Sequence, residues 1–463
     1  MKSVKWILPF VAVIVAACNG GTVTETTSPT PAPEATARII TTTTVPALEV
    51  ETQNCGSPPV TFSPLCEVYD LLEQWHVDAP FDPGFLAAAA VRGLRAFEPE
   101  STEEPPRTLI CAIPDAAFSV LCDELARRIQ ESQVPVGPAV EAAMSYMIDV
   151  GLDPFTYYLP ANQAGSLRLN GIVSGVGVLL DARDTAGSKC TEVTEVCRLE
   201  VVVVLEDNPA SAAGLLSGDV VTHVDGASTL GRGFTGIVAE IAGDETGTVV
   251  LTIDRDGESL DIPIVRSELT VPTVEYGVPI DDVGYVRIPD FEADIPDLVE
   301  ASLEEMVIEG MSTLVVDLRD NPGGLVDAVV EVADQFVDGG VVLVSDAPDE
   351  HLEYEAEPGG LVTEQRLLVL VNQGTASAAE ILAGTLRDRR DALIIGSNTF
   401  GKDAVQIPFS LRNGAEFYVA VARWSTPNGL NAADGGLIPD RELAWPTGAT
   451  ATEVVELALE ASS

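Results

Sequence analysis

The stretch VLVNQGTASAAEILAG, residues 369–384, joins an apolar run that predicts a strand to a small-residue run that predicts a helix, with a lone serine, Ser377, near the junction. A serine at such a junction can cap the helix through its hydroxyl group. It can also act as a nucleophile, but only if a neighbouring base removes its proton. The first chemical question is therefore which residue could serve Ser377 as a base.

Histidine is the usual base, but the chain has only three histidines, His76, His223 and His351, and none lies in a segment that the pattern places near Ser377. The remaining candidate is Lys402, the single lysine after residue 269, in the segment IIGSNTFGKDAVQI. Burial among apolar groups lowers the pKa of a lysine from its ordinary value of about 10.4 and so favours the neutral amine. Ser–Lys dyads are a known variant of the serine triad. The alternative is a lysine exposed at a turn.

Composition limits the classes of function. The chain has 463 residues, 46% of them hydrophobic, which is enough for two or three domains with cores of their own. Its 72 acidic and 25 basic residues leave a net charge of −47. This balance argues against nucleic-acid binding, which needs basic patches, and indicates a strongly solvated surface. No metal-binding motif stands out, and we expect neither a metal nor another cofactor.

The first 18 residues, MKSVKWILPFVAVIVAAC, have a basic head, a short apolar core and small residues before Cys18. The last four resemble a bacterial lipobox, so we predict a lipoprotein signal peptide over residues 1–18 and lipidation of Cys18. The alternative is an ordinary secretory signal cut nearby. Lipidation implies an exported protein, anchored at the bacterial cell membrane and facing the periplasm or the exterior.

Cysteine usage agrees with export. Six cysteines remain after Cys18, an even set suited to an oxidising compartment, and we predict three disulfides. Cys190 and Cys197 should form a local pair, whereas Cys55, Cys66, Cys111 and Cys122 allow three pairings.

Four segments follow the signal peptide. Residues 19–54 are rich in Thr and Pro and predict a disordered tether, and residues 55–168 predict a helical N-terminal region. Residues 169–268 predict a β-rich domain, with a hairpin turn at Asp256-Gly257. From residue 269 to 463, strands and helices alternate, which predicts an α/β core with a partly parallel sheet and active loops at the carboxyl ends of its strands.

The β-rich segment resembles a PDZ domain. Its sequence SGVGV, residues 174–178, is similar to the loop whose backbone N–H groups hold the carboxylate of a bound peptide, and the NPASAAGLLSGD run that starts at Asn208 matches the helix and turn of that family. The resemblance implies that Gly175, Val176 and Gly177 bind exposed C-terminal tails by strand addition. The alternative is a plain β-rich domain in which glycines only form turns.

The chain as a whole resembles the carboxyl-terminal processing proteases, also called tail-specific proteases, over roughly residues 86–441. The motifs that carry the resemblance are MIDVGLDPFTYYLP (147–160), VDLRDNPGGLV (316–326), VNQGTASAAEILAGTLRD (371–388), IGSNTFGKDAVQ (395–406), STPNG (425–429) and GGLIPD (435–440). The resemblance implies an α/β multidomain fold, with a ClpP/crotonase-like protease core, an inserted PDZ domain and a helical N-terminal region.

The resemblance also implies the roles of individual residues. Ser377 would be the nucleophile, Lys402 the general base and Gln406 the residue that orients the lysine amine. The backbone N–H groups of Ala378 and of a glycine in the NPGG loop, with Gly323 preferred, would form the oxyanion hole. Asp388 matches an acidic position of the family. It lies about three helical turns past Ser377, so a structural or orienting role suits it better than direct chemistry.

Two positions depart from the family pattern. Asp403 follows Lys402 where the family usually has glycine, and a carboxylate there would raise the pKa of the lysine, against the mechanism. Thr375 stands where serine is common. We therefore keep three readings: a lipid-anchored Ser–Lys endopeptidase that takes polypeptides with exposed apolar C-termini, a catalytically inactive PDZ scaffold of the cell envelope, and a Ser–His hydrolase. An oligomer or an activating partner is compatible with the first.

Overall fold

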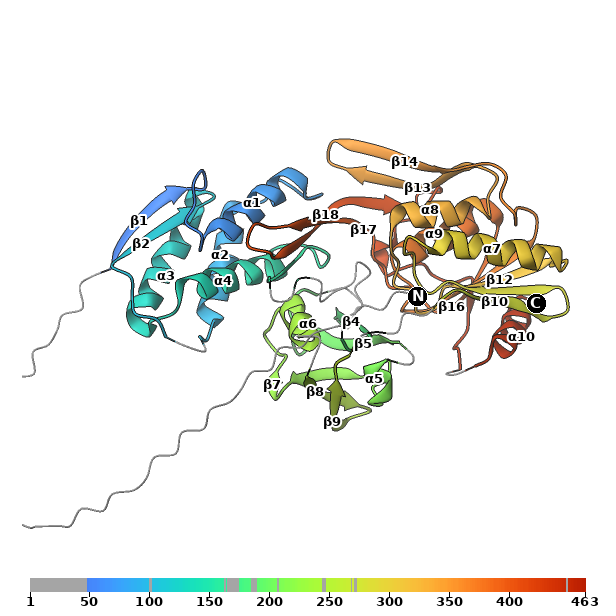
Figure 1. Ribbon diagram of the computed structural model, residues 1–463, viewed down its shortest axis with the longest axis horizontal. Coiled ribbons are helices and arrows are strands. Elements are labelled where there is room, and N and C mark those ends of the chain that lie inside the picture. The colour runs from blue at the N-terminus through green and yellow to red at the C-terminus, as the bar shows by residue number, and fades with distance from the viewer. Residues whose placement is uncertain are drawn as a thin grey trace, which may run out of the picture. The chain divides into compact units, whose positions relative to one another are not determined.

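The computed structural model describes residues 48–463 except 100–101, 162–163, 165–174, 185–189, 206–207, 244–246, 268, 270–272 and 447–448. The predicted signal peptide, Cys18 and most of the predicted tether lie outside the described residues. Within the described part, no helix is both long and apolar enough to span a bilayer. The described chain folds as a mixed α/β multidomain protein (Figure 1).

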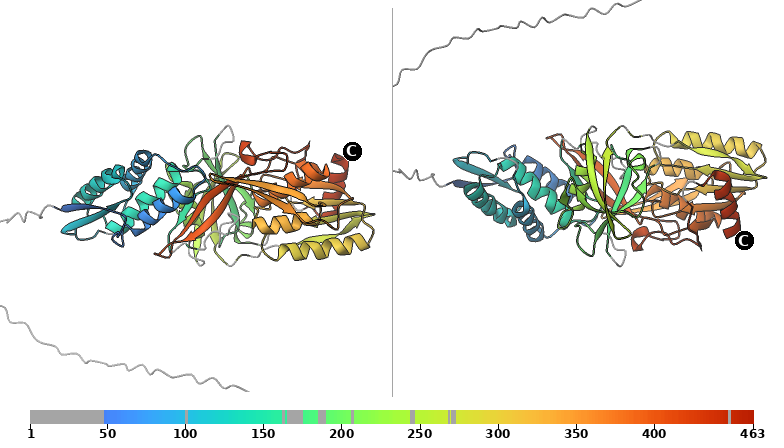
Figure 2. Two further views of the ribbon diagram at one scale, coloured as in Figure 1. Left: turned by 90° about the horizontal axis from the view of Figure 1, so that it is seen from above. Right: turned by 90° about the horizontal axis from the view of Figure 1, so that it is seen from below.

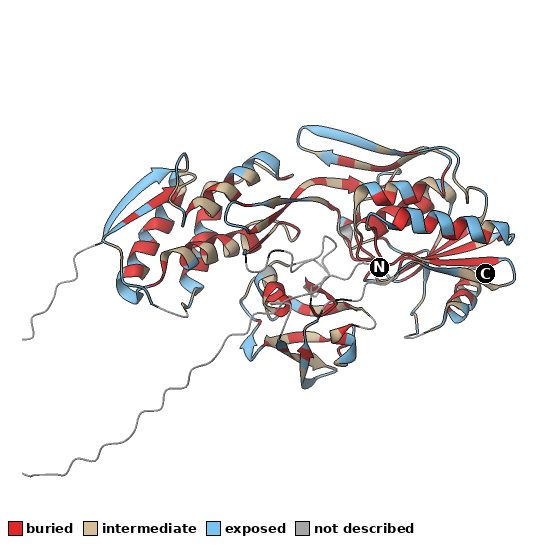
Figure 3. Ribbon diagram, viewed as in Figure 1, coloured by how far each residue is buried: buried red, intermediate tan, exposed pale blue. Residues whose placement is uncertain are grey.

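A six-stranded sheet carries the C-terminal part of the chain, with β10 antiparallel to β11 and all further neighbours parallel. Its strands, in spatial order, are β10 (Glu275–Ile280), β11 (Val283–Arg287), β12 (Thr313–Asp317), β15 (Arg366–Val371), β16 (Leu393–Gly396) and β19 (Arg441–Glu442). The partly parallel sheet predicted from the alternation of strands and helices is therefore confirmed. Figure 3 shows most of its inner strands as buried.

Both faces of this sheet are covered, which explains why its strands are apolar at consecutive positions. Val369 faces a core shared with α7 (Ile295–Ile308), α8 (Val326–Asp334) and α9 (Ala378–Arg390), whereas its neighbours Leu368 and Leu370 face α10 (Ala451–Ala461). Figure 1 shows α7, α8 and α9 on one side of the sheet and α10 on the other.

A second, antiparallel sheet links the α/β core to the N-terminal helices. It contains β3 (Tyr157–Leu159), β13 (Gly340–Ala347), β14 (Glu350–Ala356), β17 (Ala404–Ser410) and the long β18 (Glu416–Ser425). One part of β18 pairs with β13, while Phe417 and Val419 are buried in the core of the N-terminal helices. Figure 2 shows the red-orange pair β17–β18 extending to the N-terminal helices.

The N-terminal region is mostly helical, as predicted. It contains α1 (Ser63–Trp75), α2 (Pro83–Ala96), α3 (Ser119–Ser132) and α4 (Val136–Gly151), with a short 3-10 turn at Ala116–Phe118.

The predicted end of the tether is wrong. Residues Glu49–Asn54 form β1, which pairs in parallel with β2 (Thr108–Ile113). Every residue of β1 is exposed, so backbone hydrogen bonds to β2 hold it and no apolar alternation marks it in the sequence.

Three disulfides are present, as predicted, and the structure decides among the open pairings. Cys55 bonds to Cys66, Cys111 to Cys122 and Cys190 to Cys197. Each pair is close in sequence, so each disulfide tightens a local loop.

The β-rich segment forms an antiparallel sheet of its own with a separate hydrophobic core. It contains β4 (Val178–Arg183), β5 (Arg198–Val204), β6 (Val220–Val224), β7 (Ala227–Ser228), β8 (Thr248–Arg255), β9 (Glu258–Val265), α5 (Pro209–Ala212) and α6 (Phe234–Ala242). The hairpin predicted at Asp256-Gly257 joins β8 and β9, and both turn residues have positive φ, as a type I′ turn requires.

Candidate active site

Three loops meet where β12, β15 and β16 end. These strands are parallel neighbours, so the chain leaves all three at the same edge of the sheet. The loop after β15 is bound to the other two, because Ala376 N–H donates to the carbonyl of Asn321 (2.9 Å) and Phe400 N–H donates to that of Thr375 (2.8 Å). The glycine loop, the nucleophile segment and the lysine segment predicted from the sequence are thus assembled at one edge.

Ser377 occupies a strained turn immediately before α9. Its φ is +54°, a region that non-glycine residues rarely adopt and that is found most often where function requires it. Gly323 lies directly against it, since a Cβ on Gly323 would lie 2.8 Å from the Ser377 Cβ and 3.0 Å from the Ala378 nitrogen. Only glycine fits this position, where φ is also +103°.

The two predicted oxyanion donors, the N–H groups of Ala378 and Gly323, differ in whether they already have an acceptor. Ala378 begins α9, where backbone N–H groups have no acceptor within the helix. The N–H of Gly323 instead donates to Asn321 Oδ1 at 2.8 Å. The structure therefore brings the glycine loop to the serine, but in this arrangement the Gly323 N–H is already engaged and cannot bind an oxyanion.

Lys402 has the electrostatics that a neutral base requires. Burial lowers its pKa to about 8, although the nearby carboxyl of Glu380 acts in the opposite direction. Among the described residues, no hydrogen bond joins the Lys402 amine to the Ser377 hydroxyl, which takes part in a capping box with Glu380. Catalytic hydrogen bonds often form only once substrate is bound.

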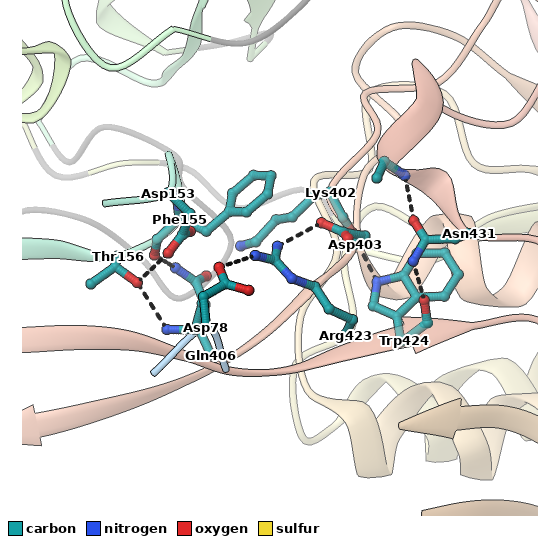
Figure 4. A network of polar contacts seen from close by, with 12 residues as sticks. Asp78, Asp153, Phe155, Thr156, Lys402, Asp403, Gln406, Arg423, Trp424 and Asn431 are labelled. Atoms are coloured by element: carbon teal, nitrogen blue, oxygen red, sulfur yellow. Dashed lines mark hydrogen bonds and ion pairs between the residues drawn. The ribbon is translucent and has the colours of Figure 1, made fainter. Parts of the chain in front are cut away.

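Gln406 lies at an irregularity in the β17–β18 pairing, next to Val405. Its Nε2 donates to the carbonyl of Phe155 rather than to any group of Lys402. Figure 4 shows the Lys402 side chain extending toward Phe155 and Gln406. The sequence thus placed Gln406 near the lysine, but it did not indicate the partner that holds the amide.

Asp403 is buried beside Lys402 and forms an ion pair with Arg423, whose Nη1 lies 3.1 Å from Asp403 Oδ1. The sequence analysis expected this carboxylate to favour the ammonium form of Lys402. The Arg423 guanidinium, which the sequence analysis did not identify, offsets that effect.

Glu380 is the main residue that the sequence analysis missed. Its fully buried carboxyl accepts from the N–H groups of Ser377 (2.8 Å), Lys402 (2.9 Å) and Gly401 (2.8 Å) and from the hydroxyl of Thr399. Burial raises its pKa, and these four donors act against that rise. One side chain thus ties the backbone of the nucleophile to the backbone of the lysine. The spacing Ser-x-x-Glu from Ser377 is the pattern of a helix capping box, which was the available signal.

Asp388 is bound to the loop after β18. Its Oδ2 accepts from the hydroxyl of Thr426 and from the N–H of Asn428, at 2.9 Å for the latter. The residue therefore stabilises the 425–429 segment that the sequence analysis singled out, and it touches neither Ser377 nor Lys402 within the described contacts.

The β-rich unit contacts both reactive loops. A guanidinium N–H of Arg183 donates to the carbonyl of Phe400, two residues before Lys402. Leu179 and Val203 share a small apolar cluster with Ala376 and Phe400. The loop that binds tails in the PDZ reading lies at the start of this unit, with Val176 buried and Gly175 and Gly177 at positive φ.

Comparisons with known proteins agree with this arrangement. Residues 282–443 match the model of peptidase family S41. The chain is 33% identical over 318 residues to a carboxy-terminal-processing protease of Bartonella bacilliformis, covering 66% of this chain and 70% of that protein. It is 33% identical over 309 residues to a carboxyl-terminal-processing protease of Picosynechococcus, covering 64% and 71%.

A further relative is a probable CtpA-like serine protease of Staphylococcus haemolyticus, which is 31% identical over 315 residues. This match covers 67% of this chain and only 61% of the length of that protein. Among solved structures, the photosystem II D1 C-terminal processing protease aligns with a TM-score of 0.60 and 26% identity over 83% of this chain and 98% of that one. Fold and site define a serine peptidase of family S41. The chain belongs to the carboxyl-terminal-processing proteases of that family, as its motifs predicted.

Proposed function

We propose that this protein is a lipid-anchored, exported serine endopeptidase that cleaves polypeptides with a Ser377–Lys402 dyad. The observation that carries the proposal is the meeting of three loops at adjacent strand ends, with Ser377 in a strained turn and a single lysine whose pKa is about 8. Glu380 holds the backbones of both residues, which fixes the distance between their loops.

The reaction follows from these groups. The neutral Lys402 amine takes the proton of the Ser377 hydroxyl while the oxygen attacks the peptide carbonyl. The N–H of Ala378, with a donor from the NPGG loop, stabilises the negative oxygen, and each such donor contributes about 3 kcal/mol. The Lys402 ammonium then protonates the leaving amine, and the regenerated amine activates the water that releases the acyl chain.

One rearrangement completes the site in this proposal. The Gly323 N–H must leave Asn321 Oδ1, or the next glycine of the loop must supply the donor. Ser377 and Lys402 must also come within hydrogen-bonding distance. Substrate binding would drive both changes.

The β-rich unit is, in this proposal, a PDZ domain that selects exposed, mostly apolar C-terminal tails. The N–H groups of Gly175, Val176 and Gly177 have no acceptor among the described residues, as a carboxylate-binding loop requires, while their carbonyls accept internal hydrogen bonds. Its contacts with Phe400 and Ala376 support a gating role, in which an occupied tail site changes the geometry of the reactive loops.

The test is cleavage of an unfolded reporter that ends in an apolar tail, compared with the same reporter amidated at its C-terminus. We expect cleavage of the free-tailed reporter, weaker cleavage of the amidated one, and none by Ser377→Ala or Lys402→Ala. Cleavage should rise with pH through an apparent pKa of about 8, because only the neutral amine is a base. Activity that survives in Lys402→Ala would contradict the dyad.

A second candidate is an inactive scaffold of the cell envelope that binds tails without cutting them. The engaged Gly323 N–H favours it, as does the lack of a hydrogen bond between Ser377 and Lys402 among the described residues. Tail binding by the wild-type chain, with no cleavage at any pH between about 6 and 10, would select this reading, since the lysine titrates within that range.

A further inference from the structure

A short segment of the N-terminal region, residues 76–78, reaches the active site from the end of α1. His76 is 1% exposed, and its two ring nitrogens have different partners. Nδ1 accepts the N–H of Asp78 at 3.0 Å, so the proton is on Nε2, which donates to Asp153 Oδ2 at 2.6 Å. The ring is thus held in one tautomer and one orientation.

Asp153 connects His76 to Gln406 through the backbone of Phe155. Its carboxylate accepts from the N–H of Phe155 (2.7 Å) and from the hydroxyl of Thr156 (2.7 Å), which fixes the turn that follows α4. The carbonyl of Phe155 then accepts the Gln406 amide. Three consecutive contacts therefore connect His76 to the residue predicted to orient Lys402. Figure 4 shows Asp153, Phe155 and Gln406 from this series.

The same two segments also hold the strand opposite Gln406. Ala420 faces Gln406 in the β17–β18 register, beside the irregularity at Val405. Its N–H donates to the hydroxyl of Thr156 (3.1 Å), and its carbonyl accepts from Val77 (2.8 Å). Such irregularities redirect side chains next to active sites and need outside support, which these two contacts supply.

A second set of contacts runs from Asp78 to the lysine turn. Arg423 lies between two carboxylates, with Nη2 at 2.9 Å from Asp78 Oδ2 and Nη1 at 3.1 Å from Asp403 Oδ1. Asp403 directly follows Lys402, and the indole N–H of Trp424 donates to the Lys402 carbonyl at 2.8 Å. Figure 4 shows the guanidinium of Arg423 between Asp78 and Asp403.

We propose that His76 and Asp78 are positioning residues of the catalytic site: His76 holds Gln406 through Asp153, and Asp78 holds Arg423 where it neutralises Asp403. The inference rests on the proposed Ser–Lys dyad. A buried carboxylate without its guanidinium, next to a lysine that must be neutral, would favour the ammonium form.

The charged groups around Lys402 come from every element packed there. They are Glu380 from α9, Asp403 from the turn before β17, Arg423 from β18, Arg183 from β4, Asp153 from the turn after α4, and His76 and Asp78 from the segment after α1. His76, Asp78 and Asp153 come close enough together to hold an ion. Their facing atoms already bind one another and Arg423, so they form a hydrogen-bonded network.

The experiment measures kcat/KM of the full chain from pH 6 to 10 in Arg423→Met and in Arg423→Met combined with Asp403→Asn. We expect Arg423→Met to move the rising limb up by about one pH unit, which is about a tenfold loss below the limb. The double variant should return the limb to its wild-type position, because the buried carboxylate next to Lys402 is gone and the Asp78 carboxylate that also loses Arg423 is exposed to solvent. Loss of packing alone would lower the rate at every pH and leave the limb unmoved, which would overturn the inference.

A second pair of variants tests the contacts that run from His76 through Asp153 to Gln406. His76→Leu removes the donor to Asp153, and we expect kcat to fall about tenfold with KM changed less than about twofold, as for lost positioning. His76→Gln keeps an N–H donor at a similar reach and should recover most of the rate. Equal losses in both variants would contradict the positioning role of His76. Should either fail to fold in thermal unfolding, Thr156→Val, which removes a hydroxyl bound to Asp153 and to the Ala420 N–H, is measured instead, and an unchanged kcat there would contradict the role of these contacts.

Failure of the inference is distinct from failure of the dyad. An inactive Lys402→Ala with an unmoved limb in Arg423→Met overturns only the positioning role. An active Lys402→Ala overturns the dyad itself.

Discussion

The two sheets that meet at the active site contribute to it in different ways. The six-stranded sheet supplies Ser377, the NPGG loop and Lys402 through three loops at neighbouring strand ends. The antiparallel sheet supplies Gln406 and Arg423 from within strands, and their partners come from residues more than 200 positions earlier in the chain. Backbone hydrogen bonds between neighbouring loops hold the site residues of the six-stranded sheet. Side-chain contacts with residues distant in sequence hold those of the antiparallel sheet.

The residues that react thus come from the six-stranded sheet, and the residues that set their orientation and ionisation come from the antiparallel sheet. Substitutions in the loops of the six-stranded sheet remove a reacting group or the scaffold that carries it. Substitutions in the antiparallel sheet leave the reacting groups in place and alter their orientation or ionisation. The expected effects therefore fall in size from a residue that reacts, through a residue that holds the reacting loops, to a residue that holds only a neighbouring loop, and the following variants test that order.

The largest effect is expected from Lys402→Arg. Arginine keeps the positive charge but does not lose its proton in proteins, so it cannot act as a base. We expect peptide cleavage to fall by about a thousandfold or more, in line with the loss of a general base. Steady-state cleavage of a tailed reporter measures this. A rate within tenfold of wild type would show that the lysine acts only through its charge.

Glu380→Ala should come next, because it leaves three N–H groups and the buried Thr399 hydroxyl without their acceptor. We expect the free energy of unfolding to fall by about 3 kcal/mol or more, with a large loss of kcat. Glu453→Ala is the matched control: Glu453 caps α10 in the same way through Thr450 but is exposed. Chemical denaturation and kinetics of both variants measure the contrast. Equal losses in the two would mean that Glu380 is only a helix cap.

Lys402→Met should raise stability in a pH-dependent way. The folded-state pKa of Lys402 is about 8, below its ordinary 10.5, so the unfolded chain binds more protons between these values and wild-type stability rises with pH there. Below pH 8 the wild type must bury an ammonium, which methionine avoids. We expect a higher Tm for Lys402→Met at pH 7 and a difference that shrinks as pH rises through 8 toward 10.5. A difference that does not vary with pH would argue against a shifted lysine.

The smallest effect is expected from Asp388→Asn. The change weakens the contacts to Thr426 and Asn428, which hold the loop after β18. We expect a loss of about 1 kcal/mol in the free energy of unfolding, the typical net contribution of one hydrogen bond, with kcat within about twofold of wild type. Thermal unfolding and reporter cleavage measure the two quantities. A drop in kcat without a drop in stability would assign Asp388 an orienting role after all.

The sequence predicted the loops of the six-stranded sheet well and the contacts of the antiparallel sheet poorly. Strand ends, glycine turns and the Ser377 and Lys402 segments are local patterns, and the alternating elements were enough to place their loops at one edge. The partners of Gln406 and Asp403 depend on which strands lie side by side, which a single sequence does not reveal. β1 was missed because it has no buried face, and Glu380 because its capping pattern also fits an ordinary helix start.

The central claim is that Lys402 activates Ser377. Its most direct test is the rate of covalent labelling of Ser377 by a serine-reactive fluorophosphonate, followed by peptide mass spectrometry across pH 6 to 10, in wild type and in Lys402→Ala. The account predicts an adduct on Ser377 whose rate of formation rises through an apparent pKa of about 8 and is lost in Lys402→Ala. Labelling that is independent of pH, or that persists without the lysine, would contradict it.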